Sequence, residues 1–451
     1  MIYPIISITA SDIVRATGGE LAHGSSDAII SSISCDSRTV TGDALFVPLK
    51  GERFDGHSFI ADVCQRGIGG YIFSGDAPLC NAPFAIRVAD TSQALIDIAA
   101  YYRTLFDIPV VGLTGSVGKT TTKELVASVL SRKYNTHCTK GNFNNNVGVP
   151  LTLFGLSKEH EAAVIEMGMS NFGEIEVLSV CSAPDIAIIT NIGTSHIEFL
   201  GSQEGILKAK SEIFKGLAPH GKVILNGDDP YLLTLKDKLA GREVRYVGIN
   251  NPDCDYVATD ISSDESGCSF KVNSKSYTIN LAGVHNVYNA LLAIAAGEML
   301  DLDHGAIADG LALYHSDGIR QNIISVNGYK LINDCYNSSP QSAIAALSVL
   351  RDVKAERRIA VLGDIAELGD KAELLHRSVG KAVCDSSVDV LVTVGKLSGY
   401  IADEAENKEI HSFDSSPEAG RFIKGFVTKG DAILVKGSRC MKMEQISEML
   451  I

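Results

Sequence analysis

The sequence of 451 residues contains no tryptophan and no extended run of lysine or arginine. Its formal net charge is −14, from 40 basic and 54 acidic side chains. A chain that is acidic and lacks a basic cluster is poorly suited to bind nucleic acid through its charge. Acidic ligands would therefore have to be held by local donors and not by the overall field of the protein.

Long hydrophobic runs are also missing, since each apolar stretch is far shorter than the ~20 residues that a membrane span requires. The N-terminal residues lack the basic region and the apolar stretch of a secretory signal. We therefore expect a cytoplasmic protein with no membrane insertion. The hydrophobic content of 45% is ordinary for a globular chain, and no low-complexity tract suggests disorder.

Cysteine pairs with metal-binding spacing are absent as well. The chain has ten cysteines, and none of them forms a C-x-x-C pair. This spacing makes both a zinc site and a disulfide framework poor interpretations. We expect single, mostly buried thiols in a reducing compartment.

The length predicts about three domains at ~150 residues each. The first, residues 1–107, reads as a small mixed α/β unit. Strands are expected at 44–49 and 69–74, a loop at 51–59, and a connecting helix at 92–106.

The second domain, residues 108–314, alternates buried strands with helices, which is typical of a parallel sheet in an α/β domain. The expected strands are 108–115, 162–168, 185–193 and 221–229, and the expected helices include 120–133 and 286–300. Together with the glycine-rich segment 110–124 described below, this alternation predicts a P-loop ATPase-type domain.

In the third domain, residues 315–451, the sequence predicts a hairpin at 324–334 with an Asn-Gly turn. Further strands, at 357–364, 388–395, 408–413 and 431–437, predict a second, Rossmann-like α/β sheet. A cleft between two such domains is a natural ligand site.

The segment VVGLTGSVGKTTTKE (110–124) leads from an apolar strand through a glycine-rich loop into a helix. Backbone N–H groups of such a loop cradle phosphates, its lysine reaches the β- and γ-phosphates, and its hydroxyl holds Mg²⁺. One departure is Leu113, where the general motif has glycine. A tight strand–helix turn is the plain alternative, but the context favours ATP or GTP binding. The predicted contacts are Gly115, Ser116, Gly118, Lys119, Thr120 and Thr121.

Polar side chains follow neighbouring predicted strands, at the edge where α/β sheets bind ligands. Glu166 ends one strand and is a candidate Mg²⁺ ligand, or a salt-bridged acid. His196 follows another strand and could bind a metal or accept a proton. Lys208 and Lys210 lie on one predicted helix, and chemistry alone does not choose between them. The asparagine-rich loop 140–150 offers amides for sugar, phosphate or carboxylate groups, unless it is simply a turn.

These segments together resemble the Mur ligases, the ATP-dependent amide-bond ligases of peptidoglycan synthesis. The resemblance covers nearly the whole chain, and within the family it is strongest to the ligases that join D-alanyl-D-alanine to UDP-N-acetylmuramoyl-tripeptide. It is carried, in order, by TGSVGKTTTKE, KGNFNNNVGVP, VIEMGMS, ITNIGTSHIE, GVHNVYNALLA, NDCYNSSP, LGDIAELG and VKGSRCMKME.

The resemblance implies roles for individual residues. It assigns one Mg²⁺ to Glu166 and Thr120, and a second to His196 and a carbamylated Lys210. Lys119, His196 and Lys210 are the implied catalytic residues. ATP contacts are implied for Asn286 and Asn289 at the adenine and for Arg320 and Asp334 at the phosphates and ribose. Substrate contacts are implied for Ser37 and Arg38, at the uridine diphosphate, and for Asn142. Asn337 and Pro340 lie in a segment expected to face D-alanyl-D-alanine.

The implied reaction phosphorylates a carboxylate with ATP, and the amine then attacks the acyl phosphate. A Mur-type ligase with another amine substrate, a P-loop NTPase that acts as a switch or motor, and a non-catalytic scaffold are the alternatives. Neither the sequence nor the resemblance fixes the oligomeric state, and a monomer is compatible with both. The third residue of the peptide, meso-diaminopimelate or lysine, is likewise left open.

Overall fold

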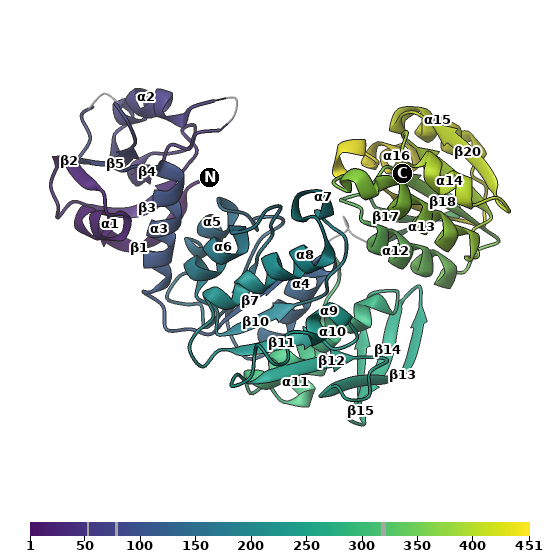
Figure 1. Cartoon of the computed structure of the whole chain (residues 1–451). Helices are drawn as coiled ribbons and strands as arrows, with labels where there is room; N and C mark the ends of the chain where they lie inside the picture. The colour runs from purple at the N-terminus through teal and green to yellow at the C-terminus, as the bar shows by residue number, and fades with distance from the viewer. Residues whose placement is uncertain (52–53, 77–79, 317–321) are drawn as a thin grey trace.

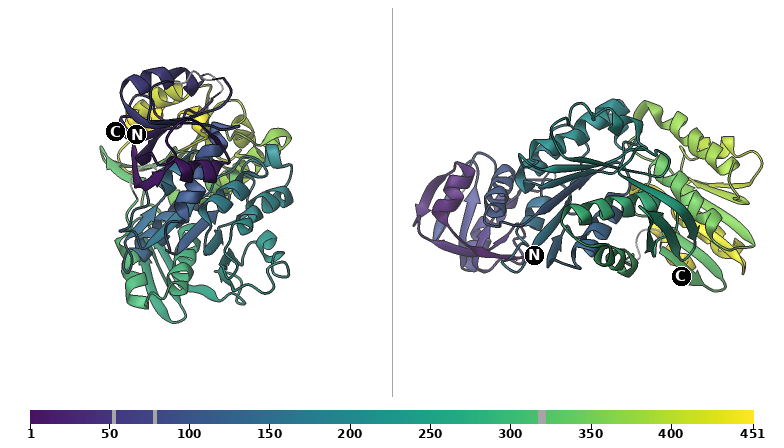
Figure 2. Two further views of the ribbon diagram at one scale, coloured as in Figure 1. Left: turned by 90° about the vertical axis from the view of Figure 1, so that its left-hand side faces the viewer. Right: turned by 90° about the horizontal axis from the view of Figure 1, so that it is seen from below.

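The computed structural model describes residues 1–51, 54–76, 80–316 and 322–451. Within these ranges the chain forms three β-sheets flanked by helices, arranged as an open arc with the N-terminal and C-terminal sheets at its ends (Figure 1). A view from below shows the same order (Figure 2). The predicted three-part α/β architecture is confirmed, while the boundaries proposed at 107/108 and 314/315 stay predictions. No helix in the described ranges is long and apolar enough to cross a membrane.

The N-terminal sheet has the strand order β1-β3-β4-β5-β6-β2 and is mixed, because β1 and β2 pair with their neighbours in antiparallel fashion. Every residue of β5 is buried, whereas β1 and β2 consist mostly of half-buried and exposed residues, so only the inner strands gave a clear apolar signal. Its elements are β1 (Tyr3–Thr9), α1 (Ala10–Thr17), β2 (Glu20–Gly24), β3 (Ile29–Ser34), β4 (Gly42–Phe46), η1 (Gly56–Phe59), α2 (Ile60–Gln65), β5 (Ile68–Phe73), β6 (Phe84–Arg87) and α3 (Thr91–Arg103).

The first half of the central unit contains the predicted phosphate loop, between β7 and α4. Strands β7, β9 and β10 are buried along their whole length, as expected for a parallel sheet covered on both faces. The elements from β7 to η2 are β7 (Val110–Thr114), α4 (Lys119–Leu130), β8 (Thr136–Cys138), α5 (Gly148–Leu153), β9 (Ala162–Glu166), α6 (Glu174–Ser182), β10 (Ile186–Ile189), α7 (Ile197–Leu200), α8 (Gln203–Ser211) and η2 (Glu212–Lys215).

The rest of the central unit extends this sheet to the order β15-β14-β13-β12-β11-β10-β7-β9-β8. Within this sheet order, neighbouring strands from β8 through β13 pair in parallel. The pairings of β13 with β14 and of β14 with β15 are antiparallel. The remaining elements are β11 (Lys222–Asn226), α9 (Pro230–Leu233), β12 (Val244–Gly248), β13 (Tyr256–Asp264), β14 (Gly267–Val272), β15 (Lys275–Ile279), α10 (His285–Met299) and α11 (His304–Leu313).

The C-terminal sheet has the order β16-β17-β21-β18-β19-β20, and only the β16–β17 pairing is antiparallel among its described strands. The predicted hairpin is confirmed, and Asn327 and Gly328 form its turn with positive φ. The elements are β16 (Asn322–Val326), β17 (Tyr329–Asp334), α12 (Pro340–Asp352), β18 (Arg357–Gly363), η3 (Gly369–Lys371), α13 (Ala372–Cys384), β19 (Val390–Val394), α14 (Gly399–Glu404), β20 (Glu409–Phe413), α15 (Ser416–Phe426), β21 (Asp431–Lys436), η4 (Arg439–Met441) and α16 (Glu444–Leu450).

Two expectations need correction. Cys64 on α2 and Cys80 form a disulfide, although we expected only single thiols. The fold places Cys80 against α2, a neighbourhood that a separation of 16 residues with no motif does not reveal. The range 51–59 is also not a loop throughout, because η1 occupies Gly56–Phe59. The Asp55 carboxylate accepts the His57 N–H at 3.0 Å and so starts this helix.

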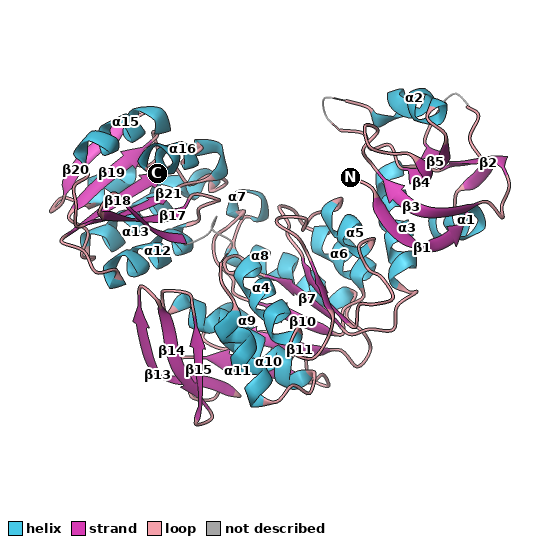
Figure 3. Ribbon diagram, turned by 180° about the vertical axis from the view of Figure 1, so that it is seen from behind, coloured by secondary structure: helices cyan, strands magenta, loops and turns pink. Residues whose placement is uncertain are grey.

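Polar contacts tie the outer units to the central one. Tyr102 Oη on α3 donates to the carbonyl of Leu156 at 2.9 Å. On the other side, the β13–β15 extension reaches toward the C-terminal unit (Figure 3). There, Lys330 forms an ion pair with Glu265, whose carboxylate also accepts the Lys354 N–H at 3.1 Å. The central and C-terminal sheets are therefore held in a defined relation around the space between them.

Candidate active site

A cavity of about 620 Å³ lies where the central and C-terminal units meet. The central unit supplies the loop after β7, the asparagine-rich loop after β8, the end of β9 and the start of α10. The C-terminal unit supplies the end of β17 and residues 336–339. The predicted cleft between the two α/β units is therefore present.

The phosphate loop joins β7 to α4 at one wall of this cavity. Gly115 and Gly118 have φ of 156° and 83°, and an added Cβ would lie 1.8 Å from Thr190 Oγ1 and 2.5 Å from Asn289 Oδ1, respectively. Glycine is therefore required at both positions. Leu113, where the general motif has glycine, lies inside β7 and pairs with Glu166 of β9 and Ile188 of β10. The departure thus falls in the buried strand, outside the turn.

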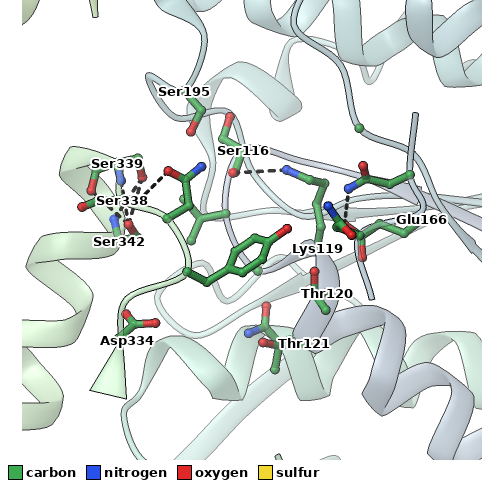
Figure 4. A pocket seen from close by; sticks show the side chains of 18 of the residues that line it. Ser116, Lys119, Thr120, Thr121, Glu166, Ser195, Asp334, Ser338, Ser339 and Ser342 are labelled. Carbon is green, nitrogen blue, oxygen red and sulfur yellow. Dashed lines mark hydrogen bonds between the residues drawn. The ribbon is translucent and has the colours of Figure 1, made fainter. Parts of the chain in front are cut away.

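Side chains of the phosphate loop point into the cavity. Lys119 Nζ donates to the carbonyls of Gly115, at 2.7 Å, and Ser116, at 3.4 Å. The Ser116 hydroxyl accepts the Gly193 N–H at 2.8 Å, which fixes the loop to the segment after β10. Thr120 and Thr121 line the same wall (Figure 4). All the predicted phosphate-loop contacts therefore lie together at the N-terminus of α4, the geometry that suits a phosphate.

Glu166 is a buried carboxylate at the end of β9, with 1% of its surface exposed. Its Oε1 accepts a hydrogen bond from Asn144 Nδ2 at 2.8 Å, and its backbone N–H donates to Thr139 Oγ1 at 3.0 Å. Its Oε2 is buried with no hydrogen-bond partner among the described residues. Because an unsatisfied buried carboxylate oxygen is costly, this atom is suited to a cation that binds in the cavity.

His196 also lines the cavity, just before α7, with a left-handed backbone of φ 62°. Its Nδ1 lies 2.6 Å from Oε2 of Glu367, which comes from the C-terminal unit. The ring is not turned in line with that oxygen, so the contact does not meet hydrogen-bond geometry. Proximity to His196 lowers the pKa of Glu367, against a smaller opposing effect of burial.

The two lysines of α8 have different surroundings. Lys208 is exposed, with its Nζ 5.4 Å from the centre of the Phe172 ring. Lys210 is 1% exposed and does not contribute to the cavity wall. Burial, reinforced by the positive charge of Lys119, lowers the pKa of Lys210 well below its ordinary value. Only Lys210 is therefore placed to be a neutral amine near the phosphate loop.

Asn286 and Asn289 connect α10 to α4, the helix that begins at the phosphate loop. Asn289 Oδ1 accepts the Thr122 hydroxyl at 3.1 Å, and Asn289 Nδ2 donates to Asn286 Oδ1 at 3.0 Å. Both side chains are buried, and both residues line the cavity. They therefore help to position the loop as well as to form the wall.

The other predicted residues are divided between the cavity and distant positions. Asn142, Asp334 and Asn337 line the cavity, whereas Pro340 is buried at the start of α12. Ser37 and Arg38 belong to the N-terminal unit and do not line it, and Arg38 pairs with Asp36 at 2.9 Å. Arg320 lies outside the residues that the structure describes.

Three further residues were not singled out from the sequence. Lys436, at the end of β21, donates to Asp334 Oδ2 at 2.7 Å and to the carbonyl of Asn337 at 2.9 Å. Asn144 orients Glu166, and Glu367 faces His196. Lys436 could have been found from the sequence, because a lysine at the end of a buried strand is unusual. Figure 4 shows Lys119 and Glu166 on one side of the cavity and Asp334 with Ser338, Ser339 and Ser342 on the other.

A phosphate loop that shares a cavity with groups from a second α/β unit suits an enzyme that brings nucleotide phosphates to another substrate. The fold and the site thus define a multidomain P-loop enzyme. Three family models match the chain, described as "Mur ligase family, catalytic domain" (29–103), "Mur ligase middle domain" (113–297) and "Mur ligase, glutamate ligase domain" (319–439). The chain belongs to the Mur ligase family.

Individual relatives support this assignment over the full length. The UDP-N-acetylmuramoyl-tripeptide–D-alanyl-D-alanine ligase of Bacillus subtilis is 38% identical, over 99% of each chain. The crystal structure of MurF from Acinetobacter baumannii matches with a TM-score of 0.92, at 33% identity and 99% coverage of each chain. MurF from Thermotoga maritima, solved in complex with ADP, matches with a TM-score of 0.82, at 27% identity, over 93% of this chain and 96% of that one.

Proposed function

We propose that this chain is an ATP-dependent ligase that joins D-alanyl-D-alanine to UDP-N-acetylmuramoyl-tripeptide in the cytoplasm, releasing ADP and phosphate. The observation that carries the proposal is the shared cavity. It has the phosphate loop of the central unit on one side and Asp334 and Lys436 of the C-terminal unit on the other. The full-length similarity to the Bacillus subtilis ligase that carries this name supports these substrates.

The nucleotide is assigned to the wall around α4 and α10. Lys119 and the loop N–H groups would hold its phosphates, and Asn286 and Asn289 would face the adenine. Asp334, placed by Lys436, would contact the ribose, and Arg320 keeps its expected role at the phosphates through resemblance alone. Lys119 is bonded to carbonyls of its own loop and would exchange these for phosphate oxygens.

The donor set also fits Mg²⁺. Oε2 of Glu166 is buried and has no hydrogen-bond partner within the described ranges, and Thr120 presents a hydroxyl in the same cavity. The described ranges contain no group of three His, Cys, Asp or Glu side chains that could hold a metal, so substrate phosphates would have to supply further ligands. When bound, Mg²⁺ offsets the negative charge of the phosphates and of the approaching carboxylate.

We assign a second Mg²⁺ to His196 and a carbamate on Lys210. Carbamylation requires a neutral amine, and the buried Lys210 has a strongly lowered pKa. The modification would turn this buried neutral amine into an anionic oxygen ligand, which the positive charge of Lys119 favours.

The chemistry needs activation because a carboxylate has no good leaving group. Attack of the tripeptide carboxylate on the γ-phosphorus of ATP forms an acyl phosphate and releases ADP. The amine of D-alanyl-D-alanine then attacks the acyl carbon, a proton leaves the nitrogen, and phosphate departs. The protein mainly has to align three ligands and offset their charge.

The three units divide this work in the proposal. Residues 1–107, with Ser37 and Arg38, would bind the uridine diphosphate, and 108–314 would bind ATP. Residues 315–451, with Asn337 in the cavity wall, would bring the amine. Asn142, also in that wall, would contact the tripeptide substrate.

Phosphate release from ATP in the presence of UDP-N-acetylmuramoyl-tripeptide, with and without D-alanyl-D-alanine, tests the proposal. A ligase requires both substrates for steady turnover. A P-loop switch or motor would release phosphate without an amine, a scaffold would bind nucleotide without turnover, and a ligase for another amine would ignore the dipeptide. Any of these three results would contradict the proposal.

A further inference from the structure

Two residues with left-handed backbones face each other across the boundary between the central and C-terminal units. His196 and Glu367 both have φ of 62°, and His196 Nδ1 lies 2.6 Å from Glu367 Oε2. This conformation is strained for a residue that carries a Cβ. Such strain persists only where the surrounding structure imposes it, and it gathers at functional sites.

The contact is part of a larger set between the two segments. The Glu367 carbonyl accepts the Glu198 N–H at 3.3 Å, and Lys371 Nζ donates to the Gly201 carbonyl at 3.2 Å. An added Cβ on Gly369, whose φ is 53°, would lie 3.2 Å from Glu198 Cγ. The two segments, 196–201 and 367–371, therefore fit closely against each other. We refer to them together as the clasp.

The C-terminal side of the clasp is anchored to its own unit. His376 on α13 is fully buried, accepts the Ile365 N–H at Nε2 (3.0 Å) and has its Nδ1 2.7 Å from the Ala372 carbonyl. Ile365 and Leu368 are also buried. Glu367 is thus presented from a fixed segment, and its position relative to His196 depends on where the whole C-terminal unit sits.

We propose that Glu367 is a positioning residue for His196. Its carboxylate keeps the proton of the imidazole on Nδ1 and leaves the Nε2 lone pair free to act in the cavity. A carboxylate on the far nitrogen commonly fixes the tautomer and the ring orientation of a metal-binding or proton-accepting histidine. A rotation of the ring alone would bring Nδ1 into line with Oε2, because the two atoms already lie 2.6 Å apart.

This arrangement links the histidine to the position of the C-terminal unit. Glu367 reaches His196 only when the clasp is formed, so the active tautomer would be favoured when the amine-binding unit is docked. The functional consequence rests on the proposed ligase activity, whereas the effect on the tautomer does not.

The test uses the full-length variants Glu367→Ala and Glu367→Gln, with the exposed Glu406→Gln as a matched control on the same unit. Ring ¹⁵N shifts of ¹⁵N-histidine-labelled, ligand-free protein report the tautomer, and His196→Gln identifies the signal. We expect Nδ1 protonation in the wild type and the control, a mixture of tautomers in Glu367→Ala, and partial retention in Glu367→Gln, whose amide oxygen still accepts. If Glu367→Ala does not fold, a reduced Nδ1 preference in Glu367→Gln decides in its place.

Turnover provides the second readout. Glu367→Ala should lower kcat by about 10–100-fold, the usual effect of losing such a partner, and Glu367→Gln should recover part of the loss. An unchanged His196 tautomer in both variants overturns the proposal, even if kcat falls. If the wild type turns over ATP without the amine, the proposed function fails, but the nitrogen shifts still decide the role of Glu367.

Discussion

Asn144 Nδ2 donates a hydrogen bond of 2.8 Å to Oε1 of Glu166 and thereby joins the asparagine-rich loop to the buried carboxylate. The other oxygen of this carboxylate has no hydrogen-bond partner among the described residues. The amide therefore orients the carboxylate so that one oxygen is satisfied by the protein and the other is available to a cation.

Replacing this amide should weaken the metal requirement of the enzyme. Asn144→Ala should lower turnover by about 10–100-fold and raise the Mg²⁺ concentration for half-maximal rate, because the carboxylate loses its orienting donor. Initial rates across a Mg²⁺ titration measure both effects, with the exposed Asn407→Ala as control. An Asn144→Ala enzyme with the Mg²⁺ dependence of the wild type would show that the contact is only structural.

Gly118 tests the phosphate loop itself. In Gly118→Ala, the new methyl group would lie 2.5 Å from Asn289 Oδ1, so the loop or the asparagine must move. We expect ATP affinity, measured by calorimetry, to fall more than about tenfold, since a 1.4 kcal/mol loss already gives that factor.

A matched control exists at Gly241, which has φ of 96° and open space where a Cβ would lie. Gly241→Ala should cost about 1–2 kcal/mol of stability through backbone strain and leave ATP affinity unchanged. Equal losses of affinity in both variants would mean that general destabilisation, and not loop geometry, is measured.

Lys210 and Lys208 offer a paired comparison on one helix. Lys210→Ala should lose most ligase activity, because the carbamate ligand cannot form, and Lys208→Ala should keep nearly all of it. Added bicarbonate should not restore the Lys210 variant, whereas short-chain carboxylates should restore part of its rate by supplying the missing oxygen ligand. Indifference of the rate to Lys210→Ala would remove the carbamate from the proposal.

His137, which lies away from the site, should make the free energy of unfolding depend on pH. Burial is the main cause that lowers its pKa to about 4. In the unfolded chain, with an ordinary pKa near 6.5, the imidazole gains its proton first as the pH falls. Unfolding free energy should therefore decrease from about pH 6.5 down to about pH 4, by roughly 2–3 kcal/mol from this group.

Chemical denaturation of wild type and His137→Gln across this range checks the effect. The glutamine amide can still donate to the Thr152 carbonyl, which lies 2.7 Å from His137 Nε2. The variant should lose less stability on acidification than the wild type, and the exposed His220→Gln should behave like the wild type. Parallel pH profiles for His137→Gln and wild type would contradict the prediction.

The buried parallel strands could be predicted because their side chains face a core on both sides. Strands β7, β9 and β10 are continuous apolar runs, and so they stand out from sequence alone. Strand β13 was missed because it is half exposed and gives no such run. The disulfide between Cys64 and Cys80 was missed because only the fold brings the two thiols together.

The same distinction applies to the site. The phosphate loop could be recognised because its chemistry lies in one contiguous segment. Asp334 and Lys436 are 102 residues apart, and their pairing depends on adjacent strands whose order the sequence does not state. The contact of Glu367 with His196 could not be predicted, because it depends on how two units dock and on left-handed backbone at both residues.

In the proposed reaction, phosphate leaves by way of an acyl phosphate on the tripeptide. Turnover with UDP-N-acetylmuramoyl-tripeptide carrying ¹⁸O in the reacting carboxylate, together with ATP and D-alanyl-D-alanine, tests it directly. We expect one ¹⁸O atom in each phosphate released, because a carboxylate oxygen bonds to the γ-phosphorus and departs with it. Phosphate that carries only unlabelled oxygen, acquired from water, would contradict the acyl-phosphate route.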